Sequence, residues 1–356
     1  MPAPGARRAG IVGTGLIGGS IGLALRRQGW HVTGSDHDPA RAEAALALGA
    51  LDALGTDPSA EITFLATPVS AVAEAARSAL AGTSGIVTDV GSVKASIVET
   101  VDDPRFLGGH PMAGSELEGV AGADADLFAG AVWVLTPTSA TADATYAAVR
   151  SVVADLGADV VALAPDHHDA LVAVVSHVPH LTAAALMGLA SERASEQRAL
   201  LRLAAGGFRD MTRIAAGHPG IWPDICAENR DAIVEVLDGL VGSLQRLRSV
   251  VVDDDRAALL EVLERARGAR VNLPSRVSRA AELCEVRIPV PDRAGVLAEV
   301  TTLAGALDVN IADLEIAHSS EGDQGVLLLL VEASAAERLR VGLVDAGFRP
   351  SVRPLE

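Results

Sequence analysis

The chain contains 356 residues, a length that suits two or three domains. Hydrophobic residues make up 49% of it but aromatic residues only 3%, so its cores must be largely aliphatic. The formal net charge of −17 argues against nucleic acid or an anionic membrane surface as a partner, although a few local arginines could still bind a small anion.

The first predicted elements follow the strand–turn–helix–strand pattern of a dinucleotide-binding domain. A short apolar run predicts a strand, and the turn after it reads Gly13-x-Gly15-x-x-Gly18. Gly13 permits the tight turn, and Gly18 lets the following helix pack on the strand. A second strand over residues 30–34 is closed by Asp36. This order and spacing predict a Rossmann-like α/β domain.

The same segment predicts NAD as the cofactor. Gly15 lets the backbone approach a pyrophosphate, and the helix start with Leu16 and Ile17 presents free N–H groups to it. The Asp36 carboxylate would accept hydrogen bonds from both ribose hydroxyls and repel a 2′-phosphate, which favours NAD over NADP. A charged His37 beside it could soften that preference.

Three further strand-like runs, within residues 62–136, continue the alternation of strands and helices. The carboxyl ends of strands in such sheets face the ligand. Two of these ends carry polar loops. The loop ATPVS contains Thr67 and Pro68, and the loop TDVGSVK contains Ser92 and the only lysine of the chain, Lys94.

Residues 108–119, GGHPMAGSELEG, place His110 among three glycines and Pro111. Glycine permits backbone angles that other residues avoid and proline fixes one, so we expect a loop of defined shape. A histidine held there is a candidate general base, because its ordinary pKa is about 6.5. The alternative is a histidine that caps a turn.

After Pro165 the pattern changes to long helices, expected over residues 166–191, 196–206, 223–252 and 256–269. Ser176 and His180 are four residues apart and should share a helix face, with a kink at Pro179. Arg209 and Arg213 are also four apart. The apolar helix faces exceed what one sheet can cover, so a homodimer is expected.

Several classes of site and location are disfavoured. The histidines of DHHDALVAVVSHVPH lack the H-E-x-x-H arrangement, so no metal is expected. We expect neither a transmembrane helix, which needs an apolar run of roughly 18 residues, nor a signal peptide, which needs an apolar core near the N-terminus. The two cysteines lack a zinc-type spacing. We therefore expect a cytoplasmic protein.

The C-terminal part reads as strand, helix, strand, strand, helix and strand over residues 283–356. This βαββαβ order predicts a ferredoxin-like module. Residues 271–282 form the expected linker, which leaves residues 1–164 for the Rossmann domain and 165–270 for the helical domain.

These motifs together resemble the prephenate/arogenate dehydrogenase family of tyrosine biosynthesis. The resemblance covers essentially the whole chain and rests on GTGLIGGS, TDVGSVK, GGHPMAGSE, DHHDALVAVVSHVPH and GFRDMTRIA followed by tryptophan. The C-terminal module looks like an ACT domain, through the sequence DRAGVL at residues 292–297 and the βαββαβ order. The resemblance implies an NAD-dependent oxidative decarboxylation, a homodimer and a tyrosine effector at the ACT domain.

The resemblance also implies roles for individual residues. His110 accepts the proton of the substrate hydroxyl, Ser92 hydrogen-bonds the same hydroxyl, and Arg213 binds a substrate carboxylate. The remaining pocket residues that it implies are Ser115, Glu116, Ser176, His180 and Arg209. Glu116 is unusual beside an anionic substrate unless it pairs with an arginine or guards entry.

Other functions remain as alternatives. Prephenate is favoured as the substrate, but an acidic residue such as Glu116 near the side chain would favour arogenate, whose side chain carries an ammonium. A short-chain dehydrogenase needs Tyr-x-x-x-Lys, whereas the only tyrosine, Tyr146, is followed by Arg150 at that spacing. A non-catalytic NAD-sensing regulator would bind NAD yet reduce none.

Overall fold

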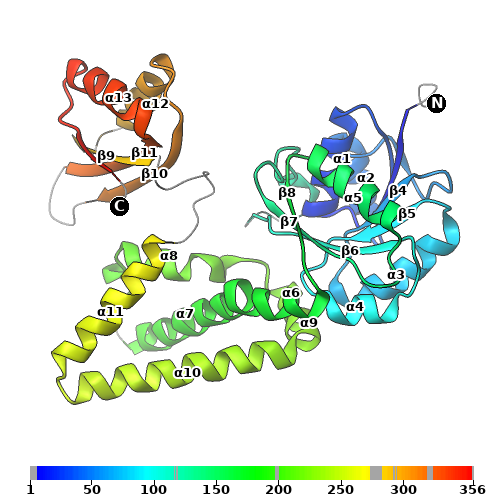
Figure 1. Ribbon diagram of the computed structural model, residues 1–356, viewed down its shortest axis with the longest axis horizontal. Coiled ribbons are helices and arrows are strands. Elements are labelled where there is room, and N and C mark those ends of the chain that lie inside the picture. The colour runs from blue at the N-terminus through cyan, green and yellow to red at the C-terminus, as the bar shows by residue number, and fades with distance from the viewer. Residues whose placement is uncertain are drawn as a thin grey trace. The chain divides into compact units, whose positions relative to one another are not determined.

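The computed structural model describes residues 6–115, 117, 119–196, 200–272, 283–291, 293, 295–318 and 324–354 (Figure 1). The chain divides into two compact units, Met1–Ser249 and Val250–Glu356. Each unit is described by itself below.

The first unit is built on an eight-stranded sheet with the order β3-β2-β1-β4-β5-β6-β7-β8. Every pair of neighbours is parallel except β6 and β7, which are antiparallel. The strands are β1 (Arg8–Val12), β2 (His31–Ser35), β3 (Ala53–Leu54), β4 (Ile62–Leu65), β5 (Ile86–Asp89), β6 (Phe106–Pro111), β7 (Val132–Thr136) and β8 (Asp159–Ala162). The predicted Rossmann-like alternation is therefore present.

Helices cover both faces of this sheet, as the parallel connections require (Figure 1). On one face α1 (Leu16–Arg27), α2 (Pro39–Leu48) and α5 (Asp143–Asp155) contribute to one aliphatic core. On the other face α3 (Val69–Gly82) and α4 (Ala95–Thr100) contribute to a second one. Both cores are rich in valine, leucine, isoleucine and alanine, in agreement with the low aromatic content.

The parallel run from β2 to β6 brings the predicted site segments to one edge of the sheet. Because the strands run in the same direction, their carboxyl ends meet there. Gly13 follows β1, Asp36 follows β2 and Thr67 follows β4, while Ser92 follows β5 and His110 lies near the end of β6.

The loop expected at residues 108–119 begins later than predicted. Gly108, Gly109, His110 and Pro111 belong to β6 and pair with β7. Neither of these glycines has a positive φ. A Cβ at Gly108 would overlap the Thr136 hydroxyl, and one at Gly109 would lie 2.7 Å from a backbone oxygen. These glycines are thus required by close strand packing rather than by unusual backbone angles.

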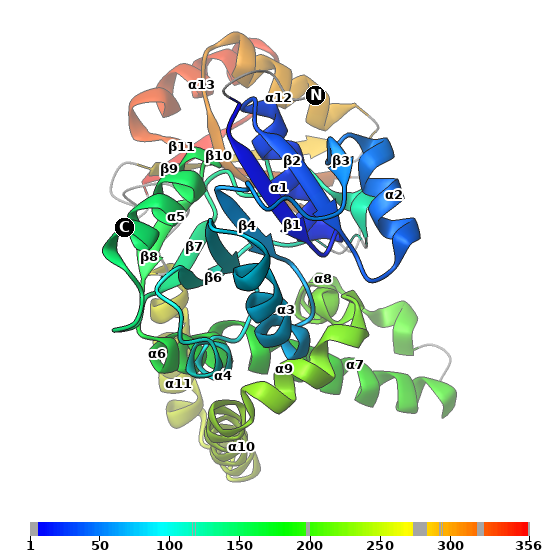
Figure 2. The same cartoon turned by 90° about the vertical axis from the view of Figure 1, so that its right-hand side faces the viewer.

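The helical part of the first unit is more broken than the sequence predicts (Figure 2). The predicted helix 166–191 contains a π-turn, and the described residues 200–205 of the predicted helix 196–206 form a 3₁₀ turn followed by irregular backbone. The elements are α6 (Pro165–Val172), the π-turn Ala173–His177, α7 (Val178–Glu196), the 3₁₀ turn Leu200–Leu203, α8 (Gly206–Thr212), the 3₁₀ turns Arg213–Ala216 and Pro219–Ile221, α9 (Trp222–Glu228) and α10 (Arg230–Val252).

One helical stretch corrects the expectation about apolar runs. Residues Pro165–Ala194 are long and apolar enough to cross a membrane by length and composition, with a mean hydropathy of 1.6. The same stretch holds the buried polar residues His168, Asp169 and His177. A single such helix is weak evidence for a membrane span, because helices in protein cores and interfaces share its composition.

The second unit contains α11 (Arg256–Val271) and a four-stranded antiparallel sheet with the order β10-β11-β9-β12. The βαββαβ order predicted for it is confirmed. Its elements are β9 (Leu283–Pro291), α12 (Val296–Ala306), β10 (Ile311–His318), β11 (Gln324–Glu332), α13 (Ala333–Asp345) and β12 (Ser351–Pro354). Alternate residues of β9 and β11 pack in a core with α12 and α13, as a half-buried sheet requires.

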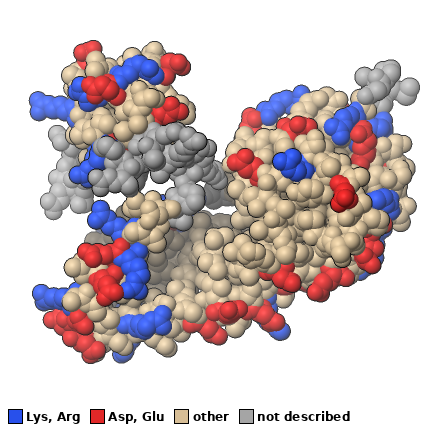
Figure 3. All heavy atoms as spheres, in the orientation of Figure 1, with Lys and Arg blue, Asp and Glu red and all other residues tan. Residues whose placement is uncertain are grey.

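Charged side chains are spread over the surface. On the face shown in Figure 3, acidic and basic residues are interspersed and separated by large uncharged areas. No continuous basic area is visible among the described residues of that face, in keeping with the excess of acidic residues in the sequence.

Candidate functional site

The turn after β1 leaves room for a dinucleotide. Gly13 has a φ of +92°, and a Cβ there would overlap the carbonyl oxygen of Ala66. A Cβ at Gly18 would overlap the carbonyl oxygen of Gly13, whereas a Cβ at Gly15 would meet nothing within 4 Å. Gly13 and Gly18 therefore close the turn against the sheet and α1, and Gly15 faces open space beside the start of that helix. An anion fits there, because the first N–H groups of a helix have no partner within it.

Asp36 is fixed at the end of β2 by a set of donors. Its Oδ2 accepts from the Thr14 amide at 2.7 Å and from the Thr14 hydroxyl at 3.2 Å, and its Oδ1 accepts from the Asp38 amide at 3.0 Å. Nδ1 of the exposed His37 lies 3.0 Å from Oδ1. Burial by itself would raise the pKa of Asp36, but the hydrogen bonds from Thr14 and Asp38 outweigh it and lower that pKa. The carboxylate is ionised and rigidly placed.

The other predicted cofactor residues lie around this turn. Leu16 and Ile17 are the first residues of α1 and are half-buried. Thr67 follows β4, and its hydroxyl is buried without a hydrogen-bond partner among the described residues. The exposed Pro68 precedes α3. A buried hydroxyl without a partner next to the glycine turn is a group that a bound ligand can satisfy.

His110 belongs to a chain of three buried side chains. Its Nδ1 lies 2.8 Å from Nε2 of His168, and Nδ1 of His168 lies 2.7 Å from Oδ1 of Asp169. The Asp169 carboxylate also accepts from the backbone amides of Lys94, at 2.8 Å, and Ala95, at 2.9 Å. Asp169 thus ties the start of α6 to the start of α4 and receives three hydrogen bonds.

These contacts determine which nitrogen of His110 is basic. Carboxylate oxygens accept, so His168 donates to Asp169 through Nδ1–H, and in the neutral imidazole its Nε2 then carries a lone pair. That lone pair accepts from Nδ1–H of His110. The Nε2 of His110 is therefore left with its lone pair and can take a proton from a bound molecule. Asp169, which accepts three hydrogen bonds, orients the two rings.

The environment of His110 keeps it neutral. Burial lowers the pKa of His110 well below its ordinary value, and His168, Lys94 and His177 lower it further by charge repulsion. His110 is 9% exposed. A general base must be unprotonated before the reaction, so this neutral, nearly buried imidazole meets the requirement.

Lys94 supports the strand that carries His110. It is fully buried and forms an ion pair with the buried Asp89. Asp89 also accepts from the amide of Gly91 at 2.8 Å and from the amide of Gly109 at 3.1 Å. Burial lowers the pKa of Lys94, and the nearby carboxylates offset part of this effect. The only lysine of the chain therefore anchors β5 to β6 and is shielded from solvent.

The helical part adds a second cluster of rings. His180 stacks on Trp222 with ring centroids 3.7 Å apart, and His177 meets the same indole edge-on with centroids 6.2 Å apart. Burial lowers the pKa of His180. Ser176 is the residue before His177, within a π-turn, the kind of helix irregularity often found at functional sites. The backbone hydrogen-bonding pattern of the helix therefore changes before Pro179.

The structure places the remaining predicted residues in different ways. Arg213 begins the 3₁₀ turn after α8, a turn that packs on α7. Arg209 is exposed, and its Nε donates to the carbonyl of Ala204. Ser115 is exposed and accepts from the amide of Leu117, while Glu116 lies outside the described residues. Ser92 is half-buried in the turn after β5.

Sequence reasoning missed four residues of this site: His168, Asp169, His177 and Asn229. The buried face of the helix that starts at Pro165 contains residues 168, 169, 172, 173 and 177. The spacing of these buried positions along the helix could have indicated that His168 is buried and His167 is exposed. The hydrogen bonds between Asp169 and the backbone amides at the start of α4 depend on tertiary structure, so the local sequence could not indicate them.

No group of three or more metal-ligating side chains occurs in the part of the chain that the structure describes. His168 and Asp169 use their side-chain nitrogens and oxygens on one another, on Nδ1 of His110 or on backbone amides. The arrangement is suited to proton transfer beside a dinucleotide.

Known proteins share both parts of this arrangement. The nucleotide-binding domain of prephenate dehydrogenase matches residues 21–162, and the dimerization domain of prephenate dehydrogenase matches residues 164–265. A prephenate dehydrogenase of Bacillus subtilis (strain 168) is 34% identical over 334 residues, which cover 89% of this chain and 90% of the relative.

Solved structures agree with the sequence relatives. The structure of prephenate dehydrogenase from A. aeolicus in complex with hydroxyphenyl propionate and NAD+ is 33% identical, has a TM-score of 0.71, and covers 75% of this chain and 98% of that chain. Synechocystis arogenate dehydrogenase is 32% identical, has a TM-score of 0.64, and covers 74% of this chain and 98% of that chain. The chain therefore belongs to the prephenate dehydrogenase family of NAD-dependent oxidoreductases, as its sequence motifs predict.

Proposed function

We propose that this protein oxidises and decarboxylates prephenate with NAD, and that His110 is the base. The observation that carries the proposal is the hydrogen-bonded chain from Nδ1 of His110 through His168 to Asp169, which leaves Nε2 of His110 to take a proton. The relatives from B. subtilis and A. aeolicus are both prephenate dehydrogenases, which supports the same substrate here.

The reaction needs few groups from the protein. When bound, NAD supplies the acceptor for the hydride that leaves C4 of the ring. The hydroxyl proton on C4 passes to Nε2 of His110. The bond between C1 and the ring carboxylate breaks, its electron pair makes the ring aromatic, and carbon dioxide leaves. The proton on His110 then returns to the phenolic oxygen, so no proton is gained or lost overall.

The protein residues around the glycine turn fit this cofactor. Gly15 and the start of α1 would hold the pyrophosphate, Asp36 the adenosine ribose, and the buried hydroxyl of Thr67 a polar group of the same molecule. Arg213 would bind a substrate carboxylate through two parallel hydrogen bonds. Ser92, Ser115, Glu116, Ser176, His180 and Arg209 complete the proposed pocket.

The direct test follows NADH formation at 340 nm with prephenate and, separately, with arogenate. We expect turnover with prephenate and a lower kcat/KM with arogenate. A clear preference for arogenate would leave the proposed mechanism unchanged and would make arogenate the substrate. The similarity to the Synechocystis arogenate dehydrogenase is the reason to test it. No reduction with either compound would contradict the proposed function.

The acidic residue at the end of β2 should determine the choice of cofactor. Replacing Asp36 with serine removes a charge that repels a 2′-phosphate, and two unit charges about 4 Å apart interact by roughly 1–4 kcal/mol near a protein surface. We expect the ratio of kcat/KM for NADP to that for NAD to rise at least about tenfold. Asp38→Asn is the matched control, because it removes a neighbouring charge and keeps the helix cap on Ala40. Equal shifts in both variants would argue against this role.

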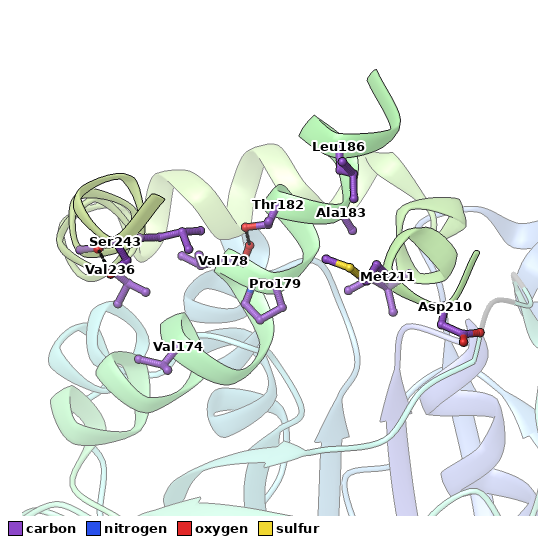
Figure 4. Close-up of a pocket in the computed structure, with 13 residues that line it drawn as sticks. Val174, Val178, Pro179, Thr182, Ala183, Leu186, Asp210, Met211, Val236 and Ser243 are labelled. Carbon is purple, nitrogen blue, oxygen red and sulfur yellow. Dashed lines mark hydrogen bonds between the residues drawn. The ribbon is translucent and has the colours of Figure 1, made fainter. Parts of the chain in front are cut away.

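We propose that the helical part forms a homodimer. An apolar cavity of about 590 Å³ lies between α7, α8 and α10 (Figure 4). Exposed apolar side chains at its rim include Val174 and Met211, which are 53% and 62% exposed. A surface of this kind favours burial by another chain, and the matching family domain is a dimerization domain.

Charges placed in this cavity should separate the dimer. We expect the double variant Val174→Glu/Met211→Glu to weaken dimerisation by roughly 100-fold or more, because a buried unpaired carboxylate costs several kcal/mol. Light scattering across a dilution series measures this. Leu48→Glu, on α2 and 47% exposed, is the control for an added surface charge. A dimer that survives the double variant would place the interface elsewhere.

We further propose that the C-terminal module is an ACT domain with tyrosine as its effector, in a cytoplasmic enzyme. The support is the βαββαβ order and the loop before α12, where Gly295 has a φ of +91° and Arg293 forms two hydrogen bonds with Glu299. Residues 292 and 294 of the predicted motif lie outside the described residues.

Tyrosine is expected to slow the wild-type enzyme. Replacing Gly295 with alanine strains this left-handed position by roughly 1 kcal/mol, so inhibition should weaken while the uninhibited rate stays unchanged. Initial rates against tyrosine concentration test this. Inhibition that is unaltered by Gly295→Ala and purely competitive with prephenate would indicate binding at the catalytic site instead.

A further inference from the structure

His177 has a defined tautomer. The side-chain nitrogen of Asn229 lies 2.8 Å from the backbone carbonyl of Asp169 and 3.1 Å from Nδ1 of His177. A carbonyl only accepts, so the Asn229 atom in contact with it must be the NH₂ group. Its second hydrogen then points at Nδ1 of His177, which must carry a lone pair. His177 therefore bears its proton on Nε2.

This Nε2–H has no hydrogen-bond partner. The atom is fully buried, and none of the described residues accepts from it. The neighbouring Trp222 ring offers no nitrogen or oxygen acceptor, because the indole nitrogen is itself a donor, and its π face is only a weak acceptor. The side chain is 1% exposed, so solvent does not replace the missing partner. Leaving a buried donor unsatisfied is unfavourable, which suggests that a ligand completes it.

The position of His177 places this donor at the reacting end of the site. Asn229 links His177 to the backbone of Asp169, and the neighbouring His168 contacts Nδ1 of His110, so His177 belongs to the same buried cluster as the base. Burial lowers the pKa of His177 to about 4, with an opposing contribution from Asp169 and a further decrease from His168. At neutral pH the site therefore holds two uncharged imidazoles of opposite character. His110 presents a lone pair, and His177 presents an N–H.

We propose that the Nε2–H of His177 donates to the substrate oxygen from which His110 takes its proton. The inference rests on the proposed function. Negative charge builds on this oxygen when its proton moves to His110, and again when the electrons of the broken C1–carboxylate bond enter the ring. A fixed donor stabilises that charge in both phases. His177 would not exchange its own proton, so the atom and electron balance of the reaction is unchanged.

Two amide variants separate this role from a structural one. In His177→Asn the side chain reaches only as far as the Nδ1 position, so its carbonyl can accept from Asn229 while the Nε2–H donor is lost. In His177→Gln the amide NH₂ reaches the Nε2 position and can still donate. We expect His177→Asn to lower kcat about 100-fold with little change in KM, as for the loss of one such donor elsewhere, and His177→Gln to recover at least tenfold of that loss.

The measurements are NADH formation with prephenate, NAD affinity by fluorescence titration, and the melting temperature of the full chain. Equal activity of the two variants, or a His177→Asn variant as active as wild type, would overturn the role of His177. A loss that follows melting temperature or NAD affinity would show a structural role only and would also overturn it. A wild type that turns over neither substrate would instead contradict the proposed function, and this inference with it.

Discussion

Replacing His110 with asparagine is expected to lower kcat with prephenate by about 10²–10⁴-fold, the usual contribution of a general base. Asparagine is the sharpest choice, because its amide nitrogen reaches the Nδ1 position and can still donate to His168. The chain of His168, Asp169 and the α4 amides therefore keeps its hydrogen bonds, and only the Nε2 lone pair is lost. NAD affinity should be unchanged, since the glycine turn and Asp36 are untouched.

The pH dependence of the wild type gives an independent check. Because burial, His168, Lys94 and His177 lower the pKa of His110 well below 6.5, the imidazole stays neutral as the pH falls past that value. The acid limb of kcat/KM should therefore lie below pH 6.5 and disappear in His110→Asn. An acid limb at or above pH 6.5, or a variant close to wild type in kcat, would contradict the assignment of the base.

Much of the fold could be predicted because its signals are local. The glycine fingerprint and the alternation of apolar runs with helical patterns indicated the Rossmann-like domain, and the order of strand and helix patterns after Cys284 indicated the C-terminal module. The strand β7 was also predicted, but its antiparallel direction gave no local signal. Its direction depends on pairing with β6, where Gly108 and Gly109 allow Thr136 and neighbouring groups to approach closely.

The helical part was predicted less accurately, for a physical reason. Alanine, leucine and valine are its commonest apolar residues, and their periodicity does not distinguish a continuous helix from one with a π-turn at residues 173–177. The extra residue in that turn changes which side chains face the site. His177 becomes buried, whereas Ser176, which the sequence pairs with His180, is only half-buried.

The candidate site could likewise be predicted only in part. His110 was identifiable because its surroundings in sequence are unusual, and Asp36 because its spacing from the glycines is characteristic. The pair of His110 with His168 is long-range, because 58 residues separate the two, whereas Lys94 and Asp89 are only 5 residues apart. Lys94 was noticed only as the sole lysine, and its burial against Asp89 depends on the parallel alignment of β5 and β6. Composition alone could not indicate that partner.

The second large effect is expected at Asp169, which touches no substrate in the proposed mechanism. Its Oδ1 accepts from His168 and from the Lys94 amide, and its Oδ2 accepts from the Ala95 amide. An asparagine side chain has one accepting oxygen and one donating NH₂ group. In the variant, the NH₂ group must therefore face a group that is itself a donor. If the NH₂ group faces His168, that ring must move its proton to Nε2. His110 then has to accept at Nδ1 and carry its own proton on Nε2, which removes the base.

We therefore expect Asp169→Asn to lower kcat by about 10²–10⁴-fold although His110 is intact, as the wrong histidine tautomer does in a serine protease triad. The free energy of unfolding should also fall, by about 1–3 kcal/mol, because a buried hydrogen-bonding group loses its partner. Asp166→Asn is the matched control, since Asp166 lies one turn earlier on the same helix and is exposed.

Stability and tautomer can be separated by experiment. Melting temperature and NAD binding report whether Asp169→Asn is folded, and ¹⁵N chemical shifts of the histidine rings report which nitrogen of His110 carries the proton. A folded variant with His110 protonated on Nε2 and a low kcat would show that Asp169 acts through the tautomer. A variant that keeps kcat within about threefold of wild type, well under the smallest effect expected of a general base, would mean that the His110 tautomer does not depend on this carboxylate. The proton-accepting nitrogen would then have to be set by the substrate itself.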